Sequence, residues 1–482
     1  MQMTGLEQKD IDAIRDGTWE VQCPTMKLSL EDESQSYEGS GVMRQDENKR
    51  LVFTLVQSSD HPDVGGIFRS LVGQQSTAVG QLIPKSQYYT LHAVADSGDE
   101  WISTPTVDVG VTHNLGNNNS VINGELWGIR QTKSHAETAN LLASISHLPV
   151  TPYCKRPRIV YYIRGTIGNF PCNTVVEIKT LVAGQERTTS CSLCAAKVDA
   201  LEYSCELISH QGRITFSAVM KKDALEHPAH IQLRFIEALQ FVLGCPVDYY
   251  VMEIHYNNNS EIHVEPAEKN KTIRKMLSPI AFNTSDSFPA FWELFQKYMS
   301  YVSSYPHNEW HPISRRIYTL HHGMSSIWPI AFLTAGVEVE GLLLDEFDKK
   351  IPPPPALVVS VNKVLQLIDD FCDKGGTDID SESRQRIGSS LGHVKNHTSA
   401  KNKLRSLLSQ NIIRKEDIDA WDIVRNKSAH AVASETGISQ ENLLKLNSVL
   451  VLFYHMVFHI IGYQGEYTDY GVLGFPTRAY PQ

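Results

Sequence analysis

The sequence LNSVLVLFYHMVFHIIG, residues 446–462, decides the fold class of the last third of the chain. It is apolar on nearly every side of a helix, yet it contains Asn447, His455 and His459. A helix of this kind lies either in a membrane or in the middle of a helical domain. About 17 residues barely reach the length that a bilayer requires, and polar side chains are costly in lipid. The stretch therefore predicts the central helix of a bundle.

Helical patterns extend upstream of this stretch to residue 288. Apolar residues recur at helical spacing in FPAFWELFQKYMSYV (288–302), RRIYTLHHGM (315–324), PIAFLTAGVEVEGLLLDEF (329–347) and VVSVNKVLQLIDDFC (358–372). The prolines at 352–355 predict a stiff, extended connector that is not helical. We expect a helical domain over residues 283–465, followed by a C-terminal tail over 466–482.

The first half of the chain has a different pattern, in which short β-rich runs alternate with Gly, Asn, Asp and Pro. The runs are RLVFTLV, YYTLHAVA, SVINGELWGI, RIVYYIRGTI, TVVEIKTLV, GRITFSAVM and DYYVMEIHY. They predict a β-rich, sandwich-like region over residues 1–270, either one region or two modules of about 1–150 and 151–270. One helix, HIQLRFIEALQFVLG (230–244), interrupts the strands, and we expect it to pack across a sheet. The fold class is α+β and multidomain.

Composition, the N-terminal sequence and the cysteines indicate the class of protein and its cellular location. The chain has 482 residues, of which 41% are hydrophobic and 20% charged, as in a globular protein. Its N-terminus, MQMTGLEQKDIDAIRDG, lacks the apolar core of a signal peptide, and its eight cysteines are scattered. We therefore expect a cytoplasmic protein with reduced thiols and no membrane association. The net charge of −10 argues against a nucleic-acid binder that is basic throughout.

Two patterns raise the possibility of a metal site. Cys191 and Cys194 form one CxxC, but a structural zinc site needs four ligands, so Cys172, Cys205 or Cys154 would have to contribute. The alternative is a pair of partly buried strand cysteines.

The second pattern is the hairpin EIHYNNNSEIHVE, which contains Glu253, His255, Glu261 and His263. A three-residue loop would place all four on one face, whereas a loop of two or four residues would separate the histidines onto opposite faces.

An arginine followed five positions later by a histidine occurs in RQTKSH (130–135), RIYTLH (316–321) and RNKSAH (425–430). RQTKSH follows a predicted strand, and RIYTLH has bulky residues between its arginine and its histidine. Only the third suits an open site, because Asn426 follows the arginine and small residues precede the histidine. The segment before it is basic: residues 384–410 contain Arg384, Arg386, Lys395, Lys401, Lys403 and Arg405 and no acidic residue. Such a charge is typical of a phosphate-binding surface, although a solvated helix face would carry it too.

These residues resemble the HEPN family (higher eukaryotes and prokaryotes nucleotide-binding), over roughly residues 310–465. Ribonucleases of this family carry the motif R-[polar]-x-x-x-H, which Arg425, Asn426 and His430 match. An acidic residue is common on the family's first long helix, and Glu338 and Glu340 are both candidates. A β-rich region followed by such a domain resembles the architecture of ApeA-type bacterial antiphage proteins.

The resemblance implies a metal-independent endoribonuclease without a cofactor, acting on RNA such as tRNA as a toxin in abortive infection. His430 would move protons, Arg425 would hold the phosphorane, and Asn426 would orient either group. We expect Lys401, Lys403, Arg405 and Lys427 to bind substrate phosphates. The β-rich region would sense a phage-derived trigger.

The motif's spacing also bears on assembly. Residues five apart on a regular helix point about 140° away from each other, so the motif must cross a helix end or work across a subunit interface. A two-fold dimer formed through the helical domain meets this requirement. The alternatives are a binding module that holds RNA or a partner without cutting it, and a structural pair of Arg425 with Asp419 or Asp422.

Overall fold

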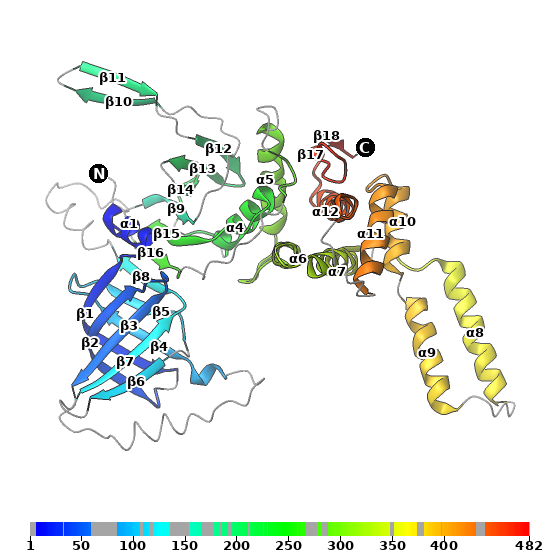
Figure 1. Cartoon of the computed structure of the whole chain (residues 1–482), viewed down its shortest axis with the longest axis horizontal. Coiled ribbons are helices and arrows are strands. Elements are labelled where there is room, and N and C mark those ends of the chain that lie inside the picture. The colour runs from blue at the N-terminus through cyan, green and yellow to red at the C-terminus, as the bar shows by residue number, and fades with distance from the viewer. Residues whose placement is uncertain are drawn as a thin grey trace. The chain divides into compact units, whose positions relative to one another are not determined.

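The structure, a computed structural model of the whole chain, divides into two compact units (Figure 1). The first comprises Met1–Gly168, Cys172–Pro228 and Val247–Lys271, and the second Asn169–Pro171, Ala229–Pro246 and Thr272–Gln482. The first unit is built mainly of strands and the second mainly of helices, which confirms the α+β, multidomain class at this level. The residues that the structure describes are 6–31, 33–58, 84–106, 109–114, 119–134, 154–164, 177–182, 185–190, 194–210, 213–224, 226–228, 230–257, 259–266, 277–281, 288–347, 351–373, 380–396, 398–429 and 439–481.

The first unit contains a 14-stranded sheet whose neighbours pair antiparallel, in the order β12-β13-β14-β9-β15-β16-β8-β5-β4-β1-β2-β3-β7-β6. Its strands are β1 (Glu20–Leu30), β2 (Ser36–Gln45), β3 (Leu51–Ser58), β4 (Tyr89–Val94), β5 (Glu100–Ser103), β6 (Val109–Asn114), β7 (Asn119–Leu126), β8 (Ile129–Ser134), β9 (Cys154–Ile163), β12 (Cys194–Ala200), β13 (Tyr203–His210), β14 (Arg213–Met220), β15 (Tyr249–Asn257) and β16 (Asn259–Val264). All seven predicted runs contain strands, and all but TVVEIKTLV join one continuous sheet rather than the two separate sheets of a sandwich. A separate hairpin is formed by β10 (Glu177–Val182) and β11 (Gln185–Ser190), and the unit also has a short 3₁₀ turn, η1 (Lys85–Gln87).

Much of the large sheet shares one core. Phe53 of β3, Trp101 of β5 and Ile262 of β16 belong to the same buried cluster, although these strands are not neighbours in the sheet. The sheet must therefore curve around this core. Helix α1 (Gln8–Asp16) adds Ile11 and Ile14 to the cluster. In β4, β5 and β16 alternate residues supply the buried side chains, as the period of two in a strand requires.

The second unit contains nine described helices and a C-terminal hairpin. They are α4 (Ile231–Leu243), α5 (Phe288–Val302), α6 (Pro312–Met324), α7 (Trp328–Phe347), α8 (Pro355–Asp373), α9 (Ser381–Asn396), α10 (Ala400–Ser409), α11 (Lys415–Ala429), α12 (Gln440–Ile461), β17 (Gly465–Thr468) and β18 (Thr477–Tyr480). All four predicted upstream helices are present, so the apolar periodicity located them correctly. The prediction for the prolines is wrong at one position, because Pro355 begins α8; the first turn of a helix tolerates proline, whose missing N–H would be unpaired there.

Helix α4 belongs to the helical unit, which corrects the expectation that it packs across a sheet. Its apolar side packs along α5, where the rings of Phe241 and Tyr298 stack with centroids 4.4 Å apart. Its buried Arg234 pairs with Glu237 at 2.6 Å. The same guanidinium donates to the carbonyl oxygens of His307 and Glu309. The partners of both Phe241 and Arg234 thus lie within the second unit.

Helix α12 is the buried central helix that the sequence predicts, and it packs against α11, α7 and α5. Within the described parts of the chain it is also the one helix long and apolar enough to cross a membrane, but 72% of that window is buried inside the fold. Buried His455 lies near the rings of Tyr467 and Tyr480 in the C-terminal hairpin. Tyr467 and Tyr480, in the segment expected as a tail, therefore belong to the helical unit's core.

Candidate active site on α7 and α11

The RNKSAH motif lies at the C-terminal end of α11. The helix begins with an ion pair between Arg414 and Asp417 at 2.7 Å and ends at Ala429. Arg425 and Asn426 are both exposed on its last turns. His430 lies outside the described residues, as does the side chain of Lys427. The described part of the motif, from Arg425 to Ala429, is thus helical.

Contacts with α7 and with its own helix hold Arg425 in place. Its Nε donates to Oε1 of Glu340 on α7, and its guanidinium carbon lies 5.8 Å from the centroid of the Trp421 ring. Trp421 is buried, and its indole N–H donates to the carbonyl oxygen of Gly336 on α7 at 3.3 Å. An added Cβ at Gly336 would lie 3.7 Å from the Cα of Arg425, so the two helices touch closely here. The arrangement presents an oriented guanidinium on an exposed surface.

Glu338, the other acidic candidate on α7, has a different role. It is 7% exposed and pairs with Arg316 of α6 at 3.0 Å, and Arg316 also pairs with Asp345 at 2.6 Å. Burial raises the pKa of Glu338, while the hydrogen bond from Arg316 opposes that rise. Of the two candidates, Glu340 is therefore the one that contacts the motif, and Glu338 joins α6 to α7.

The second Arg–His repeat, Arg316 to His321, does not form a comparable site. Arg316 belongs to the ion-pair network between α6 and α7, and His321 is fully buried, which lowers its pKa to about 3. In the first repeat, Arg130 lies in β8 and His135 falls outside the described residues. His321 packs near the C-terminal end of α6.

The basic segment before α11 carries less free charge than its sequence indicates. Acidic partners within 2.7 Å pair with three of its cations: Arg384 with Asp369, Arg386 with Glu382, and Lys401 with Asp422.

Two further cations of this segment differ in exposure. Lys403 is only 4% exposed, so it does not lie on a surface that RNA could reach. Arg405 is exposed on α10, where it donates to the side chain of Asn402 at 3.4 Å. Asp422, one of the two acids considered as partners of Arg425, pairs with Lys401 instead.

The β15–β16 hairpin does not assemble four metal ligands. Tyr256 pairs with Asn259, which leaves a two-residue loop, and His255 pairs with Ser260. The histidines therefore face opposite sides of the sheet. His255 contacts Glu253 at 3.2 Å, and His263 contacts Glu261 at 3.5 Å.

The CxxC hypothesis falls largely on residues that are not described. Cys172 and Cys191 lie outside the described residues, as do the side chains of Cys154 and Cys194. Cys205 is buried in β13, where desolvation raises the pKa of its thiol. Among the described residues, no group of three or more His, Cys, Asp or Glu side chains could hold a metal ion.

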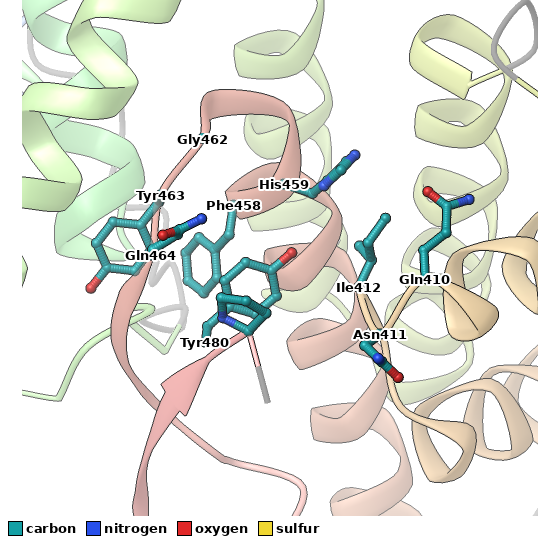
Figure 2. Close-up of a pocket in the computed structure, with 10 residues that line it drawn as sticks. Gln410, Asn411, Ile412, Phe458, His459, Gly462, Tyr463, Gln464 and Tyr480 are labelled. Carbon is teal, nitrogen blue, oxygen red and sulfur yellow. The ribbon is translucent and has the colours of Figure 1, made fainter.

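A pocket of ≈ 250 Å³ lies elsewhere in the helical unit, at the C-terminal end of α12 (Figure 2). The turn between α10 and α11 lines one side with Gln410 and Asn411, and Phe458, His459 and the C-terminal segments line the other. Arg425 is not among the residues that line it. The candidate site is thus a surface group of side chains rather than this hollow.

No family model, curated protein or solved structure matches this chain. The site accordingly rests on its own residues. Sequence reasoning missed the contact of Trp421 with Arg425, although a spacing of four residues in a helix places two side chains on the same face.

Proposed function

We propose that the helical unit is a HEPN-type endoribonuclease domain in which Arg425, Asn426 and His430 cleave RNA without a metal ion. The observation that supports this most is the exposed contact between Arg425 and Glu340. An arginine that is oriented by a carboxylate and an indole ring, yet open to solvent, is ready to receive a phosphate.

In the proposed reaction the ribose 2′-hydroxyl attacks the adjacent phosphorus, and the bond to the 5′-oxygen breaks. A base takes the 2′ proton and an acid returns a proton to the leaving oxygen; His430 provides one of these steps in each copy of the site. Arg425 donates to the phosphorane oxygens, which carry the developing negative charge. Glu340 holds Arg425 before the substrate arrives. The products are a 2′,3′-cyclic phosphate and a 5′-hydroxyl.

A second copy of the chain would complete the site. Helix α7 carries a row of apolar side chains at helical spacing that are about half exposed: Ile330, Leu333, Val337 and Leu344, at 45%, 49%, 50% and 56%. Glu340 lies in the same row, between Val337 and Leu344. A two-fold partner that covers this row would bring two Arg425–Glu340 pairs into one cleft, which supports dimerisation through the helical unit.

The proposed biological role follows the architecture. The strand-rich unit recognises a phage-derived trigger in the cytoplasm, and the helical unit then degrades RNA, such as tRNA, and stops growth of the infected cell. The division of the chain into two separately packed units supports a division between sensing and cleavage.

A binding module without catalysis is the second candidate. It is favoured by the same ion pair, because Glu340 would also hold Arg425 in a purely structural role. Incubation of the purified chain with RNA in the presence of EDTA separates the two. Cleavage that is lost in Arg425→Ala and His430→Ala, with folding retained, supports the enzyme; bound but intact RNA supports the binding module.

A further inference from the structure

Helices α8 and α9 pack against each other as a helical hairpin. The side of α8 with the lower exposure carries Val358, Val361, Leu365, Ile368 and Cys372, which recur every three or four residues. This row is covered by α9. Arg384 of α9 pairs with Asp369 of α8 at 2.7 Å and fixes the two helices across the hairpin.

A second apolar row on α8 is left uncovered by the parts of the chain that the structure describes. It consists of Leu357, Val364, Leu367 and Phe371, which are 36%, 44%, 67% and 50% exposed. Because this row lies beside the one that faces α9, α9 cannot cover both. In the heptad notation of coiled coils, Leu357, Val364 and Phe371 occupy a positions. Leu367 and Ser360 occupy the d positions between them. Exposed rows of this kind in a globular protein mark an interaction surface.

We propose that this row of α8 pairs antiparallel with the α8 row of a second copy of the chain. In an antiparallel pair each a position faces a d position. Val364 then faces the partner's Leu367, and Phe371 faces the partner's Ser360. The largest side chain of the row meets the smallest. The Ser360 hydroxyl already donates to the carbonyl oxygen of Ala356 at 2.9 Å, so it needs no further partner when covered.

The charged residues beside the row can form ion pairs with the same residues of a second copy of the chain. Lys363 and Asp370 are exposed, lie one heptad apart, and occupy the same edge of the row. An antiparallel pair sets Lys363 next to the partner's Asp370, and two-fold symmetry repeats the contact. A parallel pair in register would instead set Lys363 beside the partner's Ile368, five residues further along, which offers no charge to pair with it. This arrangement of charge selects the antiparallel pair and a second copy of the chain as its occupant.

The inference is independent of the proposed nuclease activity and is tested without RNA. Sedimentation equilibrium of the full chain is measured in a Val337→Glu background, which removes the contact proposed for α7. We expect this protein to self-associate. Lys363→Glu and Asp370→Lys, each added alone, should weaken self-association about tenfold, because each sets like charges together at both contacts. A mixture of these two variants should associate as tightly as the background protein. In the mixed pair the two introduced charges are opposite and face each other, and the native Lys363 of one chain meets the native Asp370 of the other.

Two further variants complete the test. Leu367→Asp should abolish association, because it places a carboxylate in the apolar row. Gln366→Lys changes charge on an exposed position outside the row and serves as the matched control, with unchanged association. A monomeric background protein, or a mixture that fails to recover association, would overturn the proposal; circular dichroism of each variant shows that the helices are retained.

Discussion

Arg425 of α11 and Glu340 of α7 form an ion pair although 85 residues separate them in the chain. Glu338, only two residues from Glu340, instead holds Arg316 in a largely buried contact. Helix α7 thus presents two carboxylates to two arginines. The pair of Glu340 is exposed and belongs to the candidate site, whereas the largely buried pair of Glu338 is a structural contact.

The first prediction contrasts these two carboxylates. Glu340→Gln should reduce RNA cleavage by about tenfold or more, because Arg425 is no longer held in place. The free energy of unfolding should change by less than about 1 kcal/mol, since the pair is half exposed. Glu338→Gln is the matched control: it should cost about 1–2 kcal/mol of stability and leave cleavage intact. The reverse pattern in melting and cleavage assays would assign the site to the wrong carboxylate.

The second prediction concerns the basic segment. Arg405→Gln should weaken RNA binding and reduce the slope of log affinity against log salt by about 0.7, the value for one phosphate contact on a single strand. Lys403→Gln should leave the slope unchanged and lower the melting temperature, because Lys403 is buried. Filter binding at several salt concentrations checks both. An unchanged slope in Arg405→Gln would mean that this face is merely solvated.

The sequence alone predicts the helices well and their partners poorly. Apolar spacing located α5 and α12, because a buried face leaves a periodic pattern in the chain. The same spacing in α4 shows that one face is apolar but not which element covers it. Only the structure places Phe241 against Tyr298 rather than against a strand. Likewise, alternation predicts strands, whereas joining them in one sheet depends on pairings between distant residues.

The candidate site was predictable in part. The RNKSAH motif is local, so it can be found by reading the chain. The choice between Glu338 and Glu340 is not local: two residues apart on a helix means about 200° of rotation, and only the position of α11 decides which one faces Arg425. The free charge of the basic segment was overestimated because its acidic partners, such as Asp369 and Asp422, lie outside residues 384–410.

The third prediction concerns pH. Burial lowers the pKa of His321 to about 3 in the folded chain, against about 6.5 when it is exposed in the unfolded chain. The stability that this group contributes is therefore complete above pH 6.5 and is lost as the pH falls toward 3. The loss should be about 1.4 kcal/mol per pH unit between pH 6 and pH 4. The free energy of unfolding, measured with denaturant, should depend less steeply on pH over this range in His321→Gln and His321→Leu. The slope should be smaller by that amount. Equal slopes in wild type and both variants would contradict it.

The fourth prediction concerns the apolar row of α7. Val337→Glu, which adds a charge to an exposed position at the centre of the row, should weaken dimerisation through α7 and lower cleavage in proportion. Folding should be retained, because Val337 is half exposed. Cleavage rates measured over a range of protein concentrations provide the readout. A variant that dimerises less but cleaves at the wild-type rate per chain would show that each copy contains a complete site.

The most direct test of the central claim is cleavage of RNA by the purified full chain in EDTA, with wild type, Arg425→Ala and His430→Ala compared side by side. We expect wild type to produce fragments ending in 2′,3′-cyclic phosphate, and both variants to lose activity. The melting temperature of Arg425→Ala should stay near that of wild type, since exposed polar side chains bury little apolar surface. Intact RNA with wild type, 3′-hydroxyl ends, or wild-type cleavage by either variant would contradict it.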